Sequence, residues 1–569
     1  IAFTATFVVT GLKMKEVVLL AALISLGSAR QSACGVASFS GWSSTYSVRG
    51  AINIPYAELR EPFMAYYDGT VGSSRIDYYG DVVKTYQIST MGPYGSMMKL
   101  APVTTESELN VITCLQVNGT VDGKVTPQSV LPSLDGFQCV GNEIIDGVEA
   151  QKWVRSDKTG EKISKYTMWV SMKKGNKLHG GAAEPVPIRY EMKGYNSLLG
   201  SHYDHYYLSY DLYSSDAPSA SVWEIDANLT CTSFPGPGIK SVASFNPIKE
   251  FVHNYDEHIE DSWNEFKKKH NKDYKGPVEH HKRRAVFRDN HRFVHSHNRA
   301  GFGYQLKLNH YADWTDDEMK VLRGRKHTPG GNNASVFPYP QRQVLSLANK
   351  MPDNFNWRLY GAVTPVKDQS ICGSCWSFGS TGAVEGAYFV KTGMLISLSE
   401  QALVDCSWGY GNNGCDGGED FRSYQWIMKH KGIPLEGDYG GYLGQDGFCH
   451  LDGMKLVAPI TGYVNVTPND ENALRVAMFK HGPISIAIDA SLKTFSFYSN
   501  GVYSDPKCKS APEDLDHAVL AVGYGEMNGK KYWLVKNSWS NMWGNDGYIL
   551  IASENNICGV MTAPTYVTM

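Results

Sequence analysis

The sequence predicts a multidomain α+β protein, with a β-rich N-terminal domain, a helical middle segment and a separate C-terminal domain. Its 569 residues exceed one ordinary domain of roughly 100–200 residues. Pro235-Gly236-Pro237-Gly238 and the stretch 324–340, which is rich in Gly, Pro, Asn and Ser, have the composition of linkers. We therefore expect units at 34–234, 248–326 and 350–569, with a connector at 327–349.

The overall composition excludes two classes of protein. With 42% hydrophobic and 20% charged residues, the chain is not disordered throughout. The formal net charge of −3 gives no global basic field for a nucleic acid, so we expect no such partner. The eleven cysteines are an odd number, and in an oxidising compartment at least one thiol remains unpaired.

The N-terminal residues resemble a secretory signal that starts at Met14. Lys15 precedes the apolar run 17–26, and Gly27-Ser28-Ala29 follows it. The alternative is a membrane anchor, but this run is about half of the ~20 residues that span a bilayer. We expect residues 1–33 to be upstream residues and a signal peptide, and we expect a soluble lysosomal or extracellular protein with no transmembrane segment. Four sequons are then candidate glycosylation sites: Asn118, Asn228, Asn333 and Asn465.

Residues 34–234 are expected to form an antiparallel sheet, of which a curved half-barrel is one form. The runs 75–79 and 82–86 flank Gly80-Asp81, which is typical of a hairpin. Further strand candidates are 165–171, 188–192 and the tyrosine-rich run 203–210. The four cysteines of this unit allow three pairings, among which the sequence does not choose: Cys34, Cys114, Cys139 and Cys231.

His202 and His205, on either side of Asp204, are the one candidate metal site in this unit. A polar strand or loop is the simpler interpretation of these residues. We therefore expect no metal ion and no cofactor.

Residues 248–326 are predicted to be helical. Trp263 and Phe266 lie three positions apart in a strongly charged stretch. In a longer helix that follows, six residues spaced by three or four positions share one face: Glu279, Arg283, Phe287, Asn290, Val294 and Asn298. Taken alone, this pattern is typical of an ordinary amphipathic helix with one favourable Glu279–Arg283 pair.

The C-terminal unit contains Gln369-Ser370-Ile371-Cys372-Gly373-Ser374-Cys375-Trp376. Its C-x-x-C is compatible with a redox pair or with half of a zinc site, but no second closely spaced Cys or His pair accompanies it. The third interpretation is a nucleophilic cysteine with a His and an Asn far downstream. His517 lies 142 residues after Cys375, and Asn537 lies 162 residues after it. These two downstream residues favour the third interpretation.

With these motifs, residues 350–569 resemble a papain-like cysteine protease of the cathepsin family. The middle unit is similar to the inhibitory propeptide of that family, because the six-residue helix motif is complete. A second propeptide motif occurs at 307–313, with departures at Lys307 and Tyr311. The resemblance covers about 320 residues and leaves out the N-terminal unit. The overall layout is similar to the two-chain proteases of arthropod blood cells and to counting-factor-associated proteases.

The resemblance implies a two-lobe fold, with a helical left lobe and a β-barrel-like right lobe. Cys375 and His517 then lie on opposite walls of one cleft, and Cys375 begins the central helix, whose dipole favours a thiolate. The resemblance also implies three disulfides that leave Cys375 free: Cys372–Cys415, Cys406–Cys449 and Cys508–Cys558.

The same resemblance assigns catalytic roles. The imidazolium of His517 lowers the pKa of the Cys375 thiol and later protonates the leaving amine. Asn537 orients the imidazole ring, and Trp539 covers their hydrogen bond at the edge of the pocket. Gln369 belongs to the oxyanion hole, together with the backbone N–H of Cys375.

The resemblance implies a main pocket that accepts the second residue before the scissile bond, but the side chain it prefers is less clearly indicated. Glu419 and Asp420 follow Cys415-Asp416-Gly417-Gly418, where the family has an apolar or aromatic pair, and deeper positions correspond to Ala487, Leu515 and Ala563. Either both acids point to solvent at the rim, or the pocket tolerates basic or polar side chains.

The expected function is a cysteine endopeptidase, made as a secreted or lysosomal zymogen, that acts on proteins and peptides through an acyl-enzyme. Its own propeptide inhibits it until the chain is cut between Gly324 and Met351, and the N-terminal unit then stays attached. One alternative is an aminodipeptidase with the N-terminal unit as an exclusion domain. Another is that the N-terminal unit binds a ligand or a cell surface.

Histidines are concentrated in the middle unit, which holds ten of the 17 between His253 and His327. One hypothesis is a pH switch in which they gain charge below about pH 6.5 and loosen the propeptide from the protease cleft. The helix histidines proposed for this role are His280, His281, His291 and His295. The alternative is an ordinary solvated helix surface.

Overall fold

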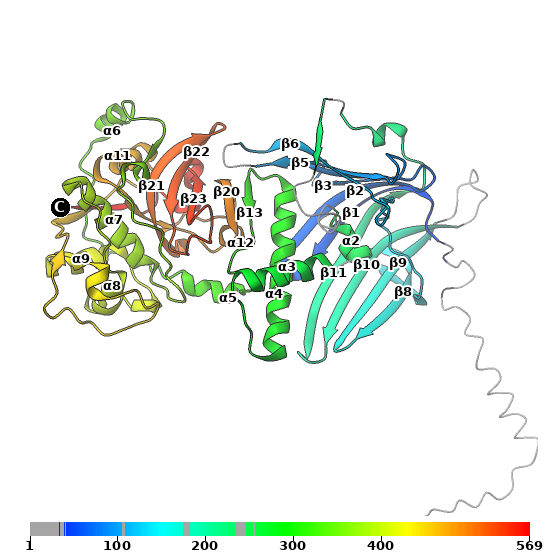
Figure 1. Cartoon of the computed structure of the whole chain (residues 1–569), viewed down its shortest axis with the longest axis horizontal. Helices are drawn as coiled ribbons and strands as arrows, with labels where there is room; N and C mark the ends of the chain where they lie inside the picture. Colours follow the sequence, from blue (N-terminus) through cyan, green and yellow to red (C-terminus); the bar gives the residue numbers. More distant parts are fainter. Residues whose placement is uncertain are drawn as a thin grey trace, which may run out of the picture.

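The computed structural model describes residues 34, 39, 41–104, 108–173, 183–226, 228–233, 246–253 and 257–569. The expected signal peptide and the linker 235–238 lie outside the described residues. A β-sheet domain, a helical segment and a second domain with the C-terminus follow one another along the long axis (Figure 1). Among the described residues, no helix has the length and apolar character that crossing a membrane requires.

The N-terminal domain is one twelve-stranded sheet, antiparallel apart from the short β12, which runs parallel to β6. The predicted hairpin is present as β3 and β4, which pair from Ser73–Ile88 to Tyr78–Val83. The order β12-β6-β5-β4-β3-β2-β1-β11-β10-β9-β8-β7 ends in two edges, so the described strands form an open sheet. The strands are β1 (Thr45–Ile54), β2 (Leu59–Asp68), β3 (Ser73–Tyr78), β4 (Val83–Ile88), β5 (Ser96–Val103), β6 (Val111–Asn118), β7 (Gln138–Ile145), β8 (Val148–Thr159), β9 (Lys162–Lys173), β10 (Glu184–Asn196), β11 (Ser201–Ser214) and β12 (Cys231–Ser233).

The core of this domain lies on one face of the sheet. Every second residue of β11 is buried at Tyr206, Leu208 and Tyr210, as expected for a strand with one covered face. Helix α2 (Ile248–Val252) packs on that face through Ile248 and Phe251. The start of the segment 248–326 therefore belongs to the N-terminal core.

Two disulfides connect the four cysteines of the N-terminal domain. The structure pairs Cys34 with Cys139 and Cys114 with Cys231. Cys114 and Cys231 are direct neighbours on β6 and β12, so this bond fixes β12 to the edge of the sheet.

The middle segment contains α3 (Glu257–Lys269), α4 (Gly276–Ala300), β13 (Tyr304–Leu306), α5 (Asp316–Met319) and η5 (Lys320–Leu322). Helix α4 has a proline in its first turn and ends at Gly301 with φ 69°, a left-handed conformation that glycine adopts without strain. Trp263 of α3 stacks among Phe266, Tyr274 and Phe287, so α3 and α4 share one apolar core.

The six motif residues of α4 hold the middle segment together. Arg283 forms ion pairs with Glu279 at 2.7 Å and with Glu318 at 2.7 Å. Asn290 donates to the carbonyl oxygen of Ala312. Asn298 exchanges two hydrogen bonds with the backbone of Leu306. The motif thus fixes the loop after α4 and positions β13.

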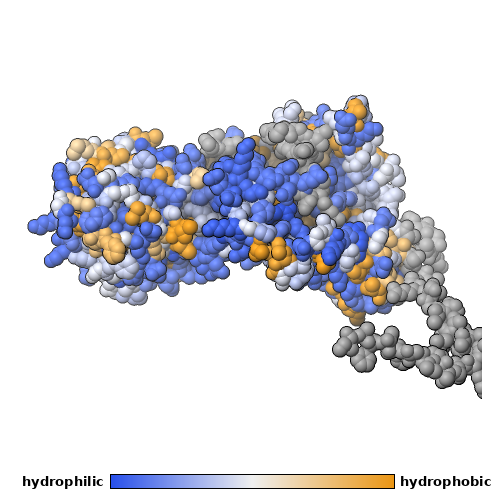
Figure 2. Space-filling model, turned by 60° about the horizontal axis from the view of Figure 1, so that its bottom comes forward, coloured by the Kyte–Doolittle hydropathy of each residue, from blue (hydrophilic) through white to orange (hydrophobic). Residues whose placement is uncertain are grey.

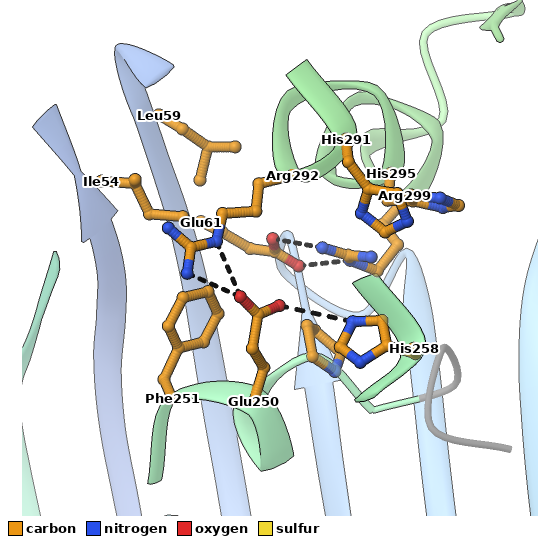
Figure 3. A pocket seen from close by; sticks show the side chains of 11 residues that line it. Ile54, Leu59, Glu61, Glu250, Phe251, His258, His291, Arg292, His295 and Arg299 are labelled. Atoms are coloured by element: carbon orange, nitrogen blue, oxygen red, sulfur yellow. Dashed lines mark hydrogen bonds and ion pairs between the residues drawn. The ribbon is translucent and has the colours of Figure 1, made fainter. Parts of the chain in front are cut away.

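Helix α4 is also buried on its opposite face, where it meets the N-terminal domain. Arg292 pairs with Asp204 at 2.8 Å and with Glu250 at 2.7 Å, and Arg299 pairs with Glu61 at 2.6 Å. Figure 3 shows the pairs Arg292–Glu250 and Arg299–Glu61 beside a small cavity of about 30 Å³, which His258, His291 and His295 also line. The sequence pattern predicted one covered face, and the structure has two.

Two of the four helix histidines in the pH hypothesis therefore face the N-terminal domain. His291 and His295 line the cavity in Figure 3; His291 is buried there and His295 is half-buried. Any effect of their protonation falls on this contact and not on the contact with the protease cleft, which corrects the hypothesis for these two residues.

The C-terminal domain has two lobes with separate cores. One lobe contains α7 (Cys375–Thr392), α8 (Glu400–Cys406), α9 (Asp420–His430) and α10 (Glu436–Tyr439). The other is built on a sheet of order β13-β20-β23-β22-β21-β19-β24-β18-β14. Its strands are β14 (Ser335–Val336), β18 (Gly462–Asn465), β19 (Ile484–Ile488), β20 (Tyr498–Tyr503), β21 (His517–Met527), β22 (Lys530–Lys536), β23 (Tyr548–Ala552) and β24 (Thr565–Thr568). This is the expected two-lobe fold.

The middle segment extends this sheet. Strand β13 pairs antiparallel with β20, from Tyr304–Gly501 to Leu306–Tyr498. The pairs Cys372–Cys415, Cys406–Cys449 and Cys508–Cys558 are disulfide-bonded, and Cys375 is a buried free thiol.

The connector contains an element that the sequence analysis did not anticipate. Helix α6 (Gln341–Ala348) packs on α11 (Glu471–His481), with Val344 and Ala348, four positions apart, buried against it. Residues 329–335 are mostly exposed, and Val336 is 87% exposed.

Candidate active site

Cys375 and His517 are the first residues of α7 and β21, which meet across the two lobes. Both are fully buried, and the Cys375 Sγ accepts a hydrogen bond from the N–H of Ala518 at 3.4 Å. His517 Nε2 lies 2.8 Å from Oδ1 of Asn537. Because Nε2 is engaged, Nδ1 is the ring nitrogen available to exchange a proton with a thiol.

An aromatic cluster covers the His517–Asn537 bond. The ring of Trp539 lies 4.9 Å from that of His517, and Phe495 and Trp543 enclose it further. Exclusion of water strengthens a hydrogen bond by lowering the local dielectric. The imidazole orientation is therefore well defined.

The side chain of Gln369 is held at both ends. Its Oε1 accepts from the hydroxyl of Ser538 at 2.7 Å, and its Nε2 donates to the carbonyl oxygens of Cys372 at 2.8 Å and Leu322 at 2.9 Å. Leu322 belongs to the middle segment. One N–H of Gln369 thus already binds a carbonyl oxygen from outside the C-terminal domain.

The chain after η5 runs through the cleft beside Cys375. Gly418 donates to the carbonyl oxygen of Gly324 at 2.9 Å and accepts from Lys326 N–H at 3.0 Å, and Arg325 N–H donates to Asp516 O at 3.0 Å. A Cβ atom on Gly324 would collide with the backbone of Gly373. Only glycine allows this close approach.

Burial keeps the two central side chains uncharged in this state. Burial raises the pKa of the Cys375 thiol to about 11. Burial, together with the nearby positive charge of Arg323, lowers the pKa of His517 to about 4. At pH 7 a neutral thiol therefore faces a neutral imidazole, and the thiolate that would attack a substrate is nearly absent.

The acids of the expected pocket do not both point to solvent. Glu419 is only 4% exposed, and it pairs with Arg422 at 2.9 Å and accepts the N–H of Thr328 at 3.0 Å. Asp420 is half-buried and accepts from the hydroxyl of Thr565 at 2.5 Å. The interpretation of both acids as solvated rim residues is wrong for Glu419.

The deeper pocket positions lie on three elements of the other lobe. Ala487 pairs with Ala518 on β19 and β21, and Leu515 precedes β21. Ala563 lies just before β24 and is half-buried.

Two contributors were missed in the sequence analysis, although their residues were visible in it. Asp516 precedes His517 and forms an ion pair with Arg323 at 3.1 Å, and burial raises its pKa to about 6. Arg325 donates from Nη1 to the carbonyl oxygen of Leu515 at 2.8 Å. The range expected for cleavage began at Gly324, whereas Gly324 and Arg325 contact the walls of the cleft.

The side chains of the possible metal site in the N-terminal domain are engaged with charged protein side chains. Both carboxylate oxygens of Asp204 accept from Arg292, and His205 Nε2 lies 2.9 Å from Glu191. Nowhere in the described part of the chain do three His, Cys, Asp or Glu side chains group as metal ligands.

Comparisons with known proteins match the middle and C-terminal segments. The model described as papain family cysteine protease matches residues 351–568, and the cathepsin propeptide inhibitor domain matches 263–319. A cathepsin L-like peptidase of Aedes aegypti is 44% identical over 54% of this chain and 93% of its own length. Human cathepsin L2 is 41% identical over 56% of this chain and 95% of its own length. The solved digestive procathepsin L2 proteinase of Tenebrio molitor is 36% identical, with a TM-score of 0.51 over 55% of this chain and all of its own.

Proposed function

Because this chain belongs to the papain family of cysteine proteases and carries a cathepsin propeptide inhibitor domain, we propose that it is the zymogen of an endopeptidase with Cys375 as its nucleophile. One observation carries the proposal: Gln369, beside the buried Cys375 thiol, donates to a propeptide carbonyl at 2.9 Å. When the thiolate adds to a substrate carbonyl in that position, negative charge develops on the carbonyl oxygen, and the same Gln369 donor stabilises it through a hydrogen bond.

The reaction follows from these contacts once the propeptide has left. Nδ1 of His517 takes the thiol proton, and the thiolate adds to the peptide carbonyl. The resulting oxyanion accepts from Gln369 Nε2 and the N–H of Cys375. The imidazolium then protonates the leaving amine, and water hydrolyses the acyl-enzyme with His517 as the base. Throughout, Asn537 holds the ring through Nε2.

The position of the N-terminal domain supports an endopeptidase over an aminodipeptidase. The domain contacts the far face of α4 through Asp204, Glu250 and Glu61. An exclusion domain must instead close one end of the mature cleft, which lies on the other side of α4. Disulfides in both domains support a route through the secretory pathway, to the lysosome or the extracellular space.

The test is a map of the positions cleaved in a denatured protein by the activated enzyme. We expect internal cuts and their complete loss in Cys375→Ser, because the hydroxyl pKa is too high for ionisation beside His517. Removal of residues two at a time from the N-terminus would instead support the aminodipeptidase. Wild-type turnover in the serine variant would contradict the role of Cys375.

A further inference from the structure

Three carboxylates lie around the expected substrate pocket. Glu419 and Asp420 follow the Gly417-Gly418 turn on one wall, and Asp516 lies next to Leu515 on the other. Glu419 has a protein cation, Arg422. The Asp420 carboxylate is hydrogen-bonded to the hydroxyl of Thr565 and to the backbone N–H of Phe421 instead.

The propeptide places a guanidinium in this part of the cleft. The backbone at Arg325 runs parallel to that at Gly418, which precedes Glu419. The side chain crosses to the opposite wall, where Nη1 donates to the carbonyl oxygens of Leu515 at 2.8 Å and Pro512 at 3.1 Å. Burial lowers the pKa of Arg325, while the charges of Asp420 and Glu419 act in the opposite direction and stabilise its cation.

Release of the propeptide removes most of the positive charge from these walls. Asp516 loses its ion pair with Arg323, and the carboxylate of Asp420 loses the neighbouring charge of Arg325. Arg422, which pairs with Glu419, stays with the protease domain, whereas Arg323 and Arg325 leave with the propeptide. The mature pocket is therefore acidic.

We propose that the mature enzyme accepts an arginine or lysine side chain in this pocket, with Asp420 as the specificity-determining residue. The inference rests on the proposed protease function and names its substrate class: chains with a basic residue second before the scissile bond. In the zymogen the backbone of Arg325 lies beside Gly418, and its guanidinium reaches the wall at Leu515. The small side chains of Ala487 and Ala563 leave room for a long one, and a substrate cation would replace Arg325 as the neighbour of Asp420.

The experiment uses the activated full-length zymogen and two aminomethylcoumarin peptides, blocked Arg-Arg and blocked Phe-Arg, which differ only at the residue in question. We expect wild-type kcat/KM for Arg-Arg to be at least about one tenth of that for Phe-Arg. Asp420→Asn should lower kcat/KM for Arg-Arg about tenfold and change Phe-Arg less than about twofold. Asp438→Asn, which removes an equal charge at an exposed position on α10, is the matched control and should change neither.

Titration of active sites with a thiol-directed epoxide corrects each preparation for misfolded protein. As a second measurement, higher ionic strength should lower kcat/KM for the Arg-Arg peptide more than for the Phe-Arg peptide in the wild type. In Asp420→Asn it should lower kcat/KM for both peptides equally. The inference is overturned if the wild type cleaves Phe-Arg but leaves Arg-Arg intact, or if Asp420→Asn affects both peptides alike. Failure to cleave either peptide would overturn the protease proposal itself.

Discussion

Gly324 and Leu322 bring the propeptide backbone into direct contact with the catalytic groups. The carbonyl oxygen of Leu322 occupies the Gln369 donor, and Gly324 lies against Gly373. Covered in this way, Cys375 and His517 are both neutral at pH 7, because burial disfavours their charged forms. The propeptide therefore inhibits in two ways: it covers the catalytic groups, and it keeps Cys375 and His517 uncharged.

We expect Gly324→Ala to weaken self-inhibition. Its Cβ would collide with backbone atoms of Gly373, which have little freedom to move, and so the segment must lift from the cleft. The measurement is the residual activity of freshly purified zymogen toward a fluorogenic peptide, which should rise by about tenfold or more. Gly441→Ala, whose added methyl group meets open space, is the control. Equal activity in both variants would contradict the importance of this contact.

Alkylation of Cys375 in the zymogen should depend strongly on pH. With a thiol pKa of about 11, the thiolate is a minor species at pH 7 and increases about tenfold for each pH unit up to that value. The rate of iodoacetamide labelling, followed by mass spectrometry, should rise accordingly between pH 7 and 9. After removal of the propeptide the rate at pH 7 should increase sharply. A rate independent of pH in the zymogen would argue against a neutral thiol.

Helix α4 has a different chemistry on each of its two buried faces. The motif face fixes the propeptide loop through hydrogen bonds of Asn290 and Asn298. The opposite face carries arginines that pair with acids of the N-terminal domain. Burial raises the pKa of Asp204, but the charges of Arg288 and Arg292 outweigh it and lower this pKa to about 2. The ion pairs are therefore charged across the physiological range.

Loss of one partner of a buried ion pair on the arginine face of α4 should lower the stability of the zymogen. Arg292→Gln removes the cation that Asp204 and Glu250 share, and we expect a loss of about 3–5 kcal/mol in the free energy of unfolding. Arg284→Gln, on the same helix, breaks a more exposed pair with Glu260 and should cost no more than about 1 kcal/mol. Urea denaturation of the full-length zymogen measures both. An equal loss of unfolding free energy in the two variants would contradict a stabilising role of the buried ion pairs.

The contact between α4 and the N-terminal domain should weaken as the pH falls. Burial lowers the pKa of His291 well below 6.5 and that of His295 to about 3. The dissociated state binds protons at higher pH than the packed state, so the contact is fully stable above about pH 6.5 and loses stability progressively toward pH 3. The charged and titratable groups facing the two rings are Glu61, Lys99, Glu250, His258, Arg292 and Arg299.

Hydrogen exchange of α4 at pH 7 and pH 5 measures this effect. We expect protection of α4 to fall at pH 5 in the wild type and to change less in the double variant His291→Gln, His295→Gln. His281→Gln, which alters a histidine with a half-exposed side chain on the same helix, should retain the wild-type pH dependence. The same pH dependence in the double variant would assign the effect to other groups.

Across the whole molecule, the propeptide lies between two domains and contacts both. Figure 2 shows a largely hydrophilic surface over the middle of the molecule, with apolar residues in separate patches. The protease side of the propeptide is bound through β13–β20 pairing and the cleft segment, and the other side through the arginine face of α4. The disulfides of the described residues all join cysteines on the same side of residue 329.

We therefore expect activation to release the N-terminal domain and the propeptide as one fragment, in contrast to the expectation from the sequence that the N-terminal unit stays attached. We expect the first cut within 329–336, where the backbone is exposed, and no covalent link between the fragments afterwards. N-terminal sequencing and non-reducing size-exclusion chromatography at pH 7 and pH 5 test this. A fragment that ends before Trp263 would contradict it, because the inhibitory helices would then remain with the protease.

The sequence alone determined the family, the three-part organisation and the candidate catalytic residues. Cys375, His517, Asn537 and the α4 motif are recognisable because their chemistry fixes both residue type and spacing. The hairpin β3–β4 was predictable for a similar reason, since alternation and turn residues are local signals.

The tertiary structure decided what depends on contacts between distant segments. The second buried face of α4 could not be predicted, because arginines and histidines on a helix look solvated until acids from another domain pair with them. Helix α6 has only eight residues, too few for a clear helical periodicity, and it is stabilised by packing on α11. The same holds for Arg325: the sequence offers a basic residue in a linker, and only the fold brings it beside Gly418 and Leu515, since position in a cleft is a property of the assembled walls.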